Sequence, residues 1–444
     1  MKENSLLMIQ KFCYQVINNS SIKTKNMLRV ILSLFILSQY SQVIRAEIYD
    51  LGGLYTQHYR DGRYADWGEY SRIGAQLAIS KINASNMLGE DKLRMKPENI
   101  IDYHCWTENI KAMMTTLAMK PIIAITGAEC SAPAAMMANF GQKFEIPVFS
   151  YGANASQLSS AKDYPWFLRV VSPSEFYEGY LIDLATHFKI DQIAYFHTTD
   201  PWGEGANKVL QQSTKNKNIK IIKKYAFPRD TSQAAIDEYV RETANLNIKN
   251  FVITTPTPDT VKIFKAMHKF GINKPGNTLF AAEMIIDRED KRAVEGSIGY
   301  FAPIVRLPKS NLLTEYMEDL KNFSNKEIDI NSANFIYSAL SYDHIMLIAN
   351  IILLIKNDEK MVSRRLLYDY MRLVSFTGIT GSISYINSSN DRLHTPIQIM
   401  NSHGAHPNGA MNFIKIAEVN QKTGQLDIDE DKILWPGGIS DYQY

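Results

Sequence analysis

Residues 121–155 read PIIAITGAECSAPAAMMANFGQKFEIPVFSYGANA, and this order of apolar and small residues predicts a strand, a helix and a second strand. The apolar runs Pro121 to Thr126 and Ile146 to Tyr151 are short and end in small or polar residues, which is typical of buried parallel strands. The stretch between them is long enough for a crossover helix. Such a unit predicts a doubly wound α/β sheet, in which ligands bind where the strands end.

The same alternation continues on both sides of this unit. Ile48 to Tyr55 is predicted as a strand, and the apolar residues after it recur at spacings of mostly three and four, which traces one helical face as far as Asn83. Further strands are predicted at Ile100 to His104, Gln192 to His197, Ile219 to Ala226, Asn250 to Thr254 and Thr278 to Ala282. Beyond Pro303 long helices are predicted, at Asn311 to Phe323 and Ala333 to Ile355, and short strands follow.

A chain of 444 residues exceeds the usual size of one hydrophobic core, so two lobes are expected. Because the late helices must return to the first sheet, the chain is expected to cross between lobes near residue 170, near 303 and around 375. This assigns 47–170 with 303–375 to the first lobe and 171–302 with 376–444 to the second. The predicted architecture is two doubly wound parallel-sheet lobes joined by a three-strand hinge.

The N-terminal segment, residues 1–46, has the layout of a secretory signal. Basic residues precede the apolar run Val30 to Leu37, and polar residues and Ile44-Arg45-Ala46 follow it. The apolar run is too short to span a bilayer, and no Cys follows it as a site for lipid attachment. Met27 is a possible true start. We expect a soluble exported protein of the periplasm, with a retained membrane anchor as the alternative.

Composition and charge exclude several classes of protein. The chain is 45% hydrophobic and 21% charged, as in an ordinary globular protein, and its formal net charge of +2 provides no basic stripe for nucleic acid. The apolar stretch Ile345 to Ile355 is interrupted by Asn350, which favours a buried helix over a membrane span. No phosphate loop or nucleophile elbow occurs in the sequence, so neither an enzyme nor a cofactor is expected. His403 and His406 have a metal-like spacing but no evident third ligand, so no metal is expected.

Cys105 and Cys130 are the only cysteines after the signal segment, because Cys13 lies within or before it. Export would place this pair in an oxidising compartment, where one disulfide is the simplest outcome and two buried free thiols are the alternative. Closing a loop of about 25 residues would stabilise the fold by on the order of 3 to 4 kcal/mol.

Two of the predicted strand ends carry residues that suit a small anionic group. After the first, Gly127-Ala128-Glu129-Cys130-Ser131 forms a tight turn, and Ser131 stands where a helix begins, as a natural N-cap. The same helix start presents backbone N–H groups that suit a carboxylate, so a bare cap and a ligand site are both open. After the second, Tyr151-Gly152-Ala153-Asn154-Ala155 has small residues that let a ligand approach the backbone closely.

Further motifs follow in a fixed order along the chain. They are Ile146-Pro147, Ser150 to Ala153 with Leu158-Ser159, Tyr164 to Arg169 with Pro173-Ser174, Asp200-Pro201-Trp202-Gly203-Glu204-Gly205, Phe376 to Ile383, Tyr385, Asn390-Asp391-Arg392 and Trp435-Pro436-Gly437-Gly438. Together with the two strand ends, this series resembles the type I periplasmic binding proteins. That family includes the leucine/isoleucine/valine-binding proteins and the extracellular ligand-binding regions of metabotropic glutamate and GABA type B receptors. The resemblance covers nearly all of the chain after Ala46.

The resemblance implies a cleft between the lobes that closes on an amino acid or a related small molecule. It assigns the ligand contacts to Trp67, Ser131, Gly152, Ala153, Asn154, Trp202 and Glu283, with Tyr151, Thr255 and Thr257 as secondary candidates. Ser131 and the loop after Tyr151 are expected around a carboxylate, although Asn154 stands where the family commonly has Thr or Ser. The two tryptophans match the aromatic walls, and Glu283 matches the acid that receives an ammonium group. Cys105 and Cys130 match the family's disulfide in the first lobe.

The residue types alone leave other interpretations open. Glu283 would also fit a solvated loop acid, and Trp67 and Trp202 would fit core or hinge packing. Our first functional expectation is a periplasmic solute-binding protein that delivers its ligand to an ABC-type importer, with an ABC permease of the inner membrane as partner. The alternative is a soluble, receptor-like sensing module that signals to a membrane partner, which the segments Phe376 to Ile383 and Trp435 to Gly438 favour.

Overall fold

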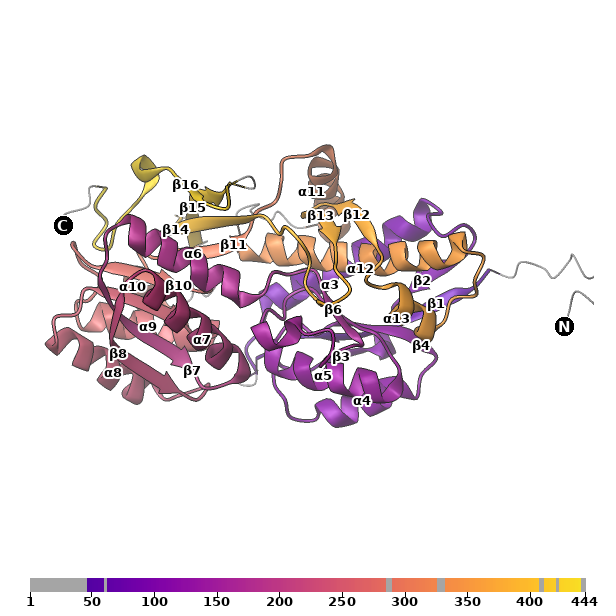
Figure 1. Ribbon diagram of the computed structural model, residues 1–444, viewed down its shortest axis with the longest axis horizontal. Coiled ribbons are helices and arrows are strands. Elements are labelled where there is room, and N and C mark those ends of the chain that lie inside the picture. The colour runs from indigo at the N-terminus through magenta and orange to yellow at the C-terminus, as the bar shows by residue number, and fades with distance from the viewer. Residues whose placement is uncertain are drawn as a thin grey trace, which may run out of the picture. The chain divides into compact units, whose positions relative to one another are not determined.

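The computed structural model describes residues 46–59, 62–284, 290–325, 332–406, 411–420 and 423–440. The expected signal segment and the possible start at Met27 lie outside the described residues, except for Ala46 at the segment's end. Residues Tyr49–Tyr444 belong to one unit, whose helices and strands Figure 1 labels in chain order. The description that follows concerns this unit.

The first sheet is built from the N-terminal third of the chain. Its strands are β1 (Ile48–Tyr55), β2 (Lys92–Arg94), β3 (Ile100–Asp102), β4 (Ile122–Gly127), β5 (Val148–Ser150) and β6 (Phe167–Arg169). The order is β2-β1-β4-β5-β6, with β3 also on β1, and the pairs β1–β3, β1–β4, β4–β5 and β5–β6 are parallel. Seven of the eight residues of β1 are buried, as expected for a central strand that is covered on both faces.

Helices join these strands and cover the sheet. They are α3 (Asp66–Ala84), α4 (Ile110–Ala118) and α5 (Ser131–Phe144), to which the later helices α11 (Asn311–Ser324), α12 (Ala333–Asn357) and α13 (Arg364–Tyr370) are added. α12 lies directly against α3, because a Cβ built on Gly74 would come within 2.2 Å of the Ser338 carbonyl oxygen. Glycine is therefore required where the two backbones meet.

The second sheet is larger and mixed. Its strands are β7 (Gln192–Thr198), β8 (Lys220–Phe227), β9 (Asn250–Thr254), β10 (Thr278–Ala281), β11 (Phe301–Val305), β14 (Ile397–Ala405), β15 (Met411–Val419) and β16 (Leu426–Ile428). The order is β16-β15-β14-β11-β10-β9-β7-β8; β7 to β11 pair in parallel, and β14 to β16 extend the sheet in antiparallel fashion. Its helices are α6 (Ser174–His187), α7 (Pro201–Asn216), α8 (Gln233–Asn245), α9 (Thr257–Lys269) and α10 (Lys291–Gly296).

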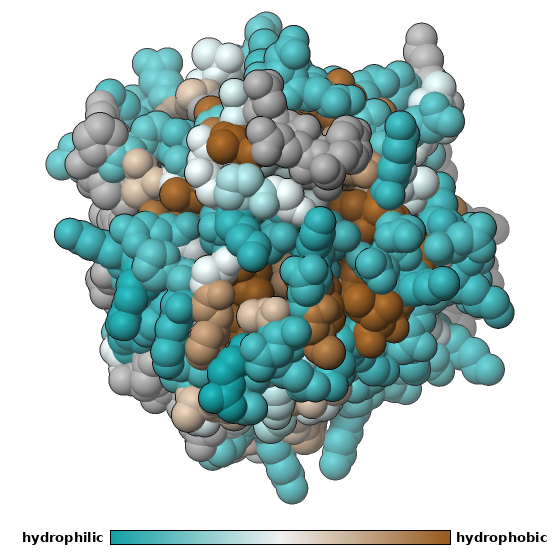
Figure 2. Space-filling model, turned by 90° about the vertical axis from the view of Figure 1, so that its left-hand side faces the viewer, coloured by the Kyte–Doolittle hydropathy of each residue, from teal (hydrophilic) through white to brown (hydrophobic). Residues whose placement is uncertain are grey.

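The end of the molecule that carries the second sheet is mainly hydrophilic, with hydrophobic residues visible between the hydrophilic ones (Figure 2). The edge strand β8 contributes to this surface with Lys220 and Lys224, both exposed. Charged side chains on an edge strand oppose pairing with another chain.

Helix α12 is, within the described residues, the one helix long and apolar enough to cross a membrane. In the structure 72% of its apolar window is buried against the rest of the protein. Its buried face includes Ile345, Ile348, Ile352 and Ile355, which belong to the main apolar cluster. This packing agrees with the interpretation of 345–355 as part of a buried core helix.

The segments that pass between the two sheets are fixed by buried charges. β12 (Ser375–Gly378) and β13 (Gly381–Ser384) form a separate hairpin, whose turn donates the N–H groups of Ile379 and Thr380 to the Asp343 carboxylate of α12 at 2.9 and 2.8 Å. Two mostly parallel α/β sheets confirm the predicted fold class. The residue limits of the lobes and the three-strand hinge remain predictions.

Candidate functional site

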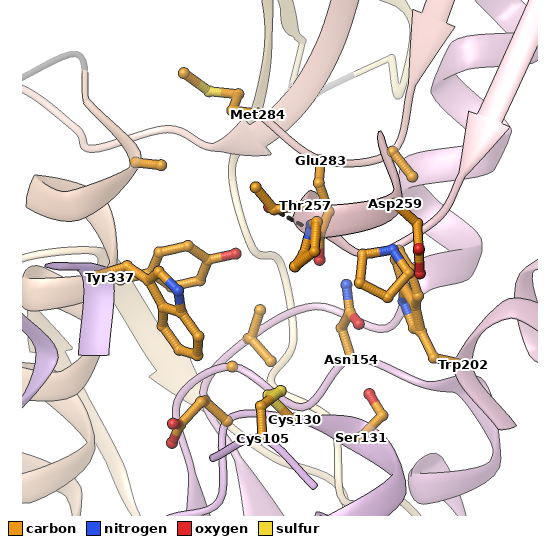
Figure 3. A pocket seen from close by; sticks show the side chains of 18 of the residues that line it. Cys105, Cys130, Ser131, Asn154, Trp202, Thr257, Asp259, Glu283, Met284 and Tyr337 are labelled. Carbon is orange, nitrogen blue, oxygen red and sulfur yellow. Dashed lines mark hydrogen bonds between the residues drawn. A yellow bond between two sulfur atoms is a disulfide. The ribbon is translucent and has the colours of Figure 1, made fainter. Parts of the chain in front are cut away.

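A cavity of about 510 Å³ lies at the carboxyl ends of the parallel strands of both sheets. Its wall contains residues that directly follow β4, β5 and β6 of the first sheet, and others that follow β7, β8, β9 and β10 of the second. The first turns of α12 complete it (Figure 3). This is where the doubly wound topology predicts a ligand site, and the volume suits a small molecule.

Most of the predicted site residues line this one cavity. They are Trp67, Ser131, Gly152, Asn154, Trp202, Thr257 and Glu283. Ala153, Tyr151 and Thr255 do not. Ala153 and Tyr151 are fully buried, the latter stacked on Tyr55 with ring centroids 6.1 Å apart, and the Thr255 hydroxyl is bonded to that of Thr260 at 2.8 Å. These three residues support the wall from behind.

Ser131 lies in the wall but does not cap its helix, so that prediction is wrong. The helix begins at Ser131 itself, Cys130 occupies the cap position, and no side chain caps this end. The Ser131 hydroxyl instead accepts a hydrogen bond from the N–H of Ala155 at 3.0 Å. This hydrogen bond joins the loop after β4 to the loop after β5.

The loop after β5 is held by a buried arginine at the end of β6. Arg169 is fully buried and donates from Nη1 to the carbonyl oxygens of Ala153 and Ala155, each at 2.9 Å. Its Nε donates to Asp391 at 2.8 Å, which supplies the opposite charge from a distant part of the chain. Because this loop is fixed on its inner side, Gly152 and Asn154 face the cavity.

Aromatic side chains form much of the remaining wall. Trp67, at the start of α3, donates from Nε1 to the hydroxyl of Tyr59 at 2.9 Å and lies 6.1 Å from the ring of Tyr337. Tyr337 reaches in from α12 and was not predicted from the sequence (Figure 3). Trp202 is 3% exposed and also packs in the apolar cluster of Ala153. It is therefore both a wall residue and a packing residue.

Glu283 lies in the cavity wall, as does the preceding residue, Ala282. The two residues come immediately after β10, which ends at Ala281. The carboxylate of Glu283 accepts a hydrogen bond from the Thr257 hydroxyl at 3.2 Å, drawn as a dashed line in Figure 3. Burial raises the pKa of the Glu283 carboxyl, and the charge of Arg229 opposes that effect. Arg229 itself is paired with Asp200 at 2.6 Å, so its guanidinium is already engaged.

Glu129 is a second acidic residue of the wall that the sequence reasoning missed. It is 5% exposed; its Oε1 accepts from the Thr56 N–H at 2.7 Å, and its Oε2 has no hydrogen-bond partner in the protein. Burial raises the pKa of this carboxyl to about 7. The available signal was a lone charge among the small and apolar residues of 127–135.

The predicted disulfide between Cys105 and Cys130 is present, with a Cα–Cα distance of 5.5 Å. Both cysteines line the cavity, where they link the loop after β3 to the start of α5. Within the described ranges, no three His, Cys, Asp or Glu side chains are placed to hold a metal ion. The wall offers hydrogen-bonding groups, aromatic rings and carboxylates, a set that suits recognition of a small charged molecule.

Comparison with known proteins places this cavity in a family of receptors. The family described as "Receptor family ligand binding region" matches residues 71–405. Metabotropic glutamate receptor-like protein E of Dictyostelium discoideum is 23% identical over 95% of this chain and 52% of its own length. Metabotropic glutamate receptor 4 of Rattus norvegicus is 25% identical over 33% of this chain and 16% of its own, and Glutamate receptor 3.1 of Oryza sativa subsp. japonica is 20% identical over 64% and 32%.

The chain thus spans about half the length of the Dictyostelium relative and less of the others. These relatives are receptors and not binding proteins of ABC transporters, which favours the receptor-like alternative over our first expectation of delivery to an importer. Since the family match covers most of the sequence, the chain belongs to the receptor family ligand binding region.

Proposed function

We propose that this chain is a ligand-sensing module of the receptor type, which binds an amino acid or a related small molecule in the cavity and reports it to a membrane partner. The observation that supports this most is the composition of the cavity wall. Ser131 and Gly152, which follow strands of the first sheet, offer hydrogen-bonding groups to one small cavity. The carboxylate of Glu283, which follows a strand of the second sheet, lies in the wall of the same cavity.

A zwitterion needs donors for its carboxylate, an anion for its ammonium group and apolar walls for the remainder. The start of α5 and the loop at Gly152 and Asn154 offer the first, Glu283 the second, and Trp67 with Trp202 the third. Each charge-assisted hydrogen bond contributes on the order of 1.5 to 3 kcal/mol. Three such contacts would contribute about 5 to 9 kcal/mol before the cost of association, and micromolar affinity requires about 8 kcal/mol net, so burial of the apolar part of the ligand must add to them.

Signalling would follow from closure of the cleft. Because the wall residues come from both sheets, a ligand that contacts both stabilises the arrangement in which the two edges are close. The relatives support a signalling membrane protein as partner in preference to a permease. The disulfide between Cys105 and Cys130 and the receptor family both support an exported domain.

The test begins with a thermal-shift screen of the purified chain against amino acids, amides, urea and polyamines. The best ligand is then titrated calorimetrically into the wild type and into Glu283→Ala. If Glu283 pairs with an ammonium group in this buried wall, its loss should cost roughly 2 to 5 kcal/mol of affinity. Such a loss is about thirtyfold to several thousandfold in Kd.

Glu204→Ala is the matched control, because Glu204 is a partly exposed acid of α7 outside the cavity wall. It should leave the affinity unchanged. An affinity of Glu283→Ala within a factor of about three of wild type would show that Glu283 is only a loop acid, and that the ligand carries no ammonium group there.

A further inference from the structure

Besides Asp230 and Asp259, the cavity wall holds two glutamates, one beside each sheet, and the proposed function uses only one of them. Glu283 follows β10 of the second sheet, and Glu129 follows β4 of the first. Glu129 is the more deeply buried of the two, and its Oε2 has no partner in the protein. A buried acceptor in a ligand cavity without a donor indicates that the ligand supplies one.

Among the cationic side chains of the wall, Arg229 acts on Glu283, but none is among the groups that act most on Glu129. Arg229 is paired with Asp200 at 2.6 Å, Lys262 is paired with Asp259 at 2.9 Å, and Arg63 lies over the ring of Tyr59 at 5.5 Å. The groups that lower the pKa of Glu129 are all uncharged: the Thr56 hydroxyl first, then the backbone of Glu129 and of Thr56, and last the Tyr103 hydroxyl. The field at Glu129 therefore favours a cation.

Aromatic rings occupy the same part of the wall. Burial raises the pKa of the Tyr337 hydroxyl, and the charges of Glu283 and Glu129, among others, raise it as well. Tyr337 therefore lies within electrostatic reach of both carboxylates. Tyr59 and Trp67 line the cavity beside it. Ring faces near a carboxylate strengthen binding of an organic cation.

We propose that Glu129 is a second cation-binding subsite, so that the ligand of this cavity carries two positively charged groups, as a basic amino acid does. One ammonium group would pair with Glu283 and the other with Glu129. This inference rests on the proposed function and narrows its ligand class to basic amino acids and their diamine analogues. L-glutamate is disfavoured, because its side-chain carboxylate would face a buried acid.

Binding should then depend on pH. The described groups that act on Glu129 or share its surroundings are the hydroxyls of Tyr55, Tyr103, Tyr151 and Tyr337, with Arg63 and His104 in the same wall. With a pKa of about 7 this carboxyl is half protonated at neutral pH. A cation that binds there favours the ionised form, so binding releases about half a proton at pH 7 and tightens as the pH rises to 8.

The test uses L-lysine and L-norleucine, which have the same six-carbon chain and differ by the terminal ammonium group of lysine. Calorimetric titration of the wild type at pH 7.5 should give a Kd for L-lysine about ten- to a hundredfold lower than for L-norleucine. Glu129→Gln keeps an acceptor for the Thr56 N–H and should bring the two affinities to within a factor of about three of each other. Glu178→Gln is the control, because Glu178 is also a buried glutamate but does not line the cavity.

Titration of the wild type in phosphate and in Tris measures the released proton without any variant. Equal affinity for the two amino acids, with dependence on Glu283 retained, would overturn the second subsite and leave the proposed function standing. Cadaverine, which is L-lysine without its carboxylate, tests the second subsite independently of amino-acid binding. If it binds in a Glu129-dependent manner while no amino acid binds, the subsite stands and the proposed function fails. If none of these probes binds with a Kd of about 10 mM or lower, which is roughly the weakest affinity that calorimetry resolves, both the second subsite and the proposed function are overturned.

Discussion

Glu178 on helix α6 is a fully buried carboxyl whose replacement gives a direct test of the electrostatics of this fold. Neither of its oxygens has a hydrogen-bond partner in the protein. Its pKa is raised from the ordinary value of 4.5 to about 8, mainly by burial and in smaller part by the charge of Glu175, while a backbone hydrogen bond opposes the rise. The hydroxyls of Tyr177 and Tyr195, on which the charge of Glu178 acts, complete its titratable surroundings.

The sign of the effect follows from where the proton is bound. Between pH 4.5 and about 8 the folded chain keeps Glu178 protonated while the unfolded chain loses that proton. The free energy of unfolding therefore falls as the pH rises through this window, by about 1.4 kcal/mol per unit. At pH 7 the accumulated loss is on the order of 3 kcal/mol. A glutamine at this position does not titrate, so the variant does not lose this stability as the pH rises.

Urea unfolding of the wild type and of Glu178→Gln at several values between pH 4.5 and pH 8 measures this loss. The two proteins should be equally stable near pH 4.5, and the variant should be more stable by on the order of 3 kcal/mol at pH 7. Glu175→Gln, three residues earlier on the same helix, removes only the smallest of the causes of this shift, so it should keep most of the wild-type fall in stability between pH 4.5 and pH 7. A Glu178→Gln protein with no gain in stability at pH 7, or with a gain independent of pH, would refute the reasoning.

Three further predictions concern packing, the disulfide and closure. Gly74→Ala should destabilise the chain by about 1 to 3 kcal/mol, because its Cβ would meet the Ser338 carbonyl oxygen. Gly179→Ala in α6 is the control, because its Cβ would enter open space, and it should stabilise the chain slightly. Thermal unfolding of the two variants and the wild type measures both effects. Peptide mapping of the non-reduced protein should recover Cys105 linked to Cys130, and reduction should cost on the order of 3 to 4 kcal/mol; two free thiols would contradict this. Small-angle scattering should show a smaller radius of gyration with saturating ligand, and unchanged curves would exclude hinge closure.

The elements predicted best from the sequence are those whose burial is uniform. Ile48–Tyr55 and Asn250–Thr254 have the predicted limits, and all but the first residue of each strand are buried. The short strand Phe167–Arg169 was not predicted as a strand, since a charged residue at its end argues against burial. Arg169 is buried because Asp391 and several carbonyl oxygens surround it, and a residue 222 positions away leaves no local signal.

The candidate site was predicted from the family resemblance together with the rule that ligands lie at strand ends, and its errors follow from side-chain direction. Tyr151 was included for its position after β5, but its ring turns inward to Tyr55 and His344. Glu129 was left out, because the sequence of a tight turn does not show which way its side chains point. Tyr337 could not be placed without knowing that α12 returns to the first sheet.

The motifs that carry the family resemblance mostly hold the frame of the cleft and leave its charges open. Asp200 caps α7 by accepting from the Gly203 N–H at 3.0 Å, and Gly299 meets the backbone of Trp435 and Pro436 where a Cβ would not fit. Contacts of this kind position strand ends whatever the ligand is. The sign and number of charges in the cavity depend on side chains such as Glu129, which the frame does not require. Membership of a receptor family therefore supports a binding role for this chain, whereas the nature of its ligand has to be inferred from its own cavity wall.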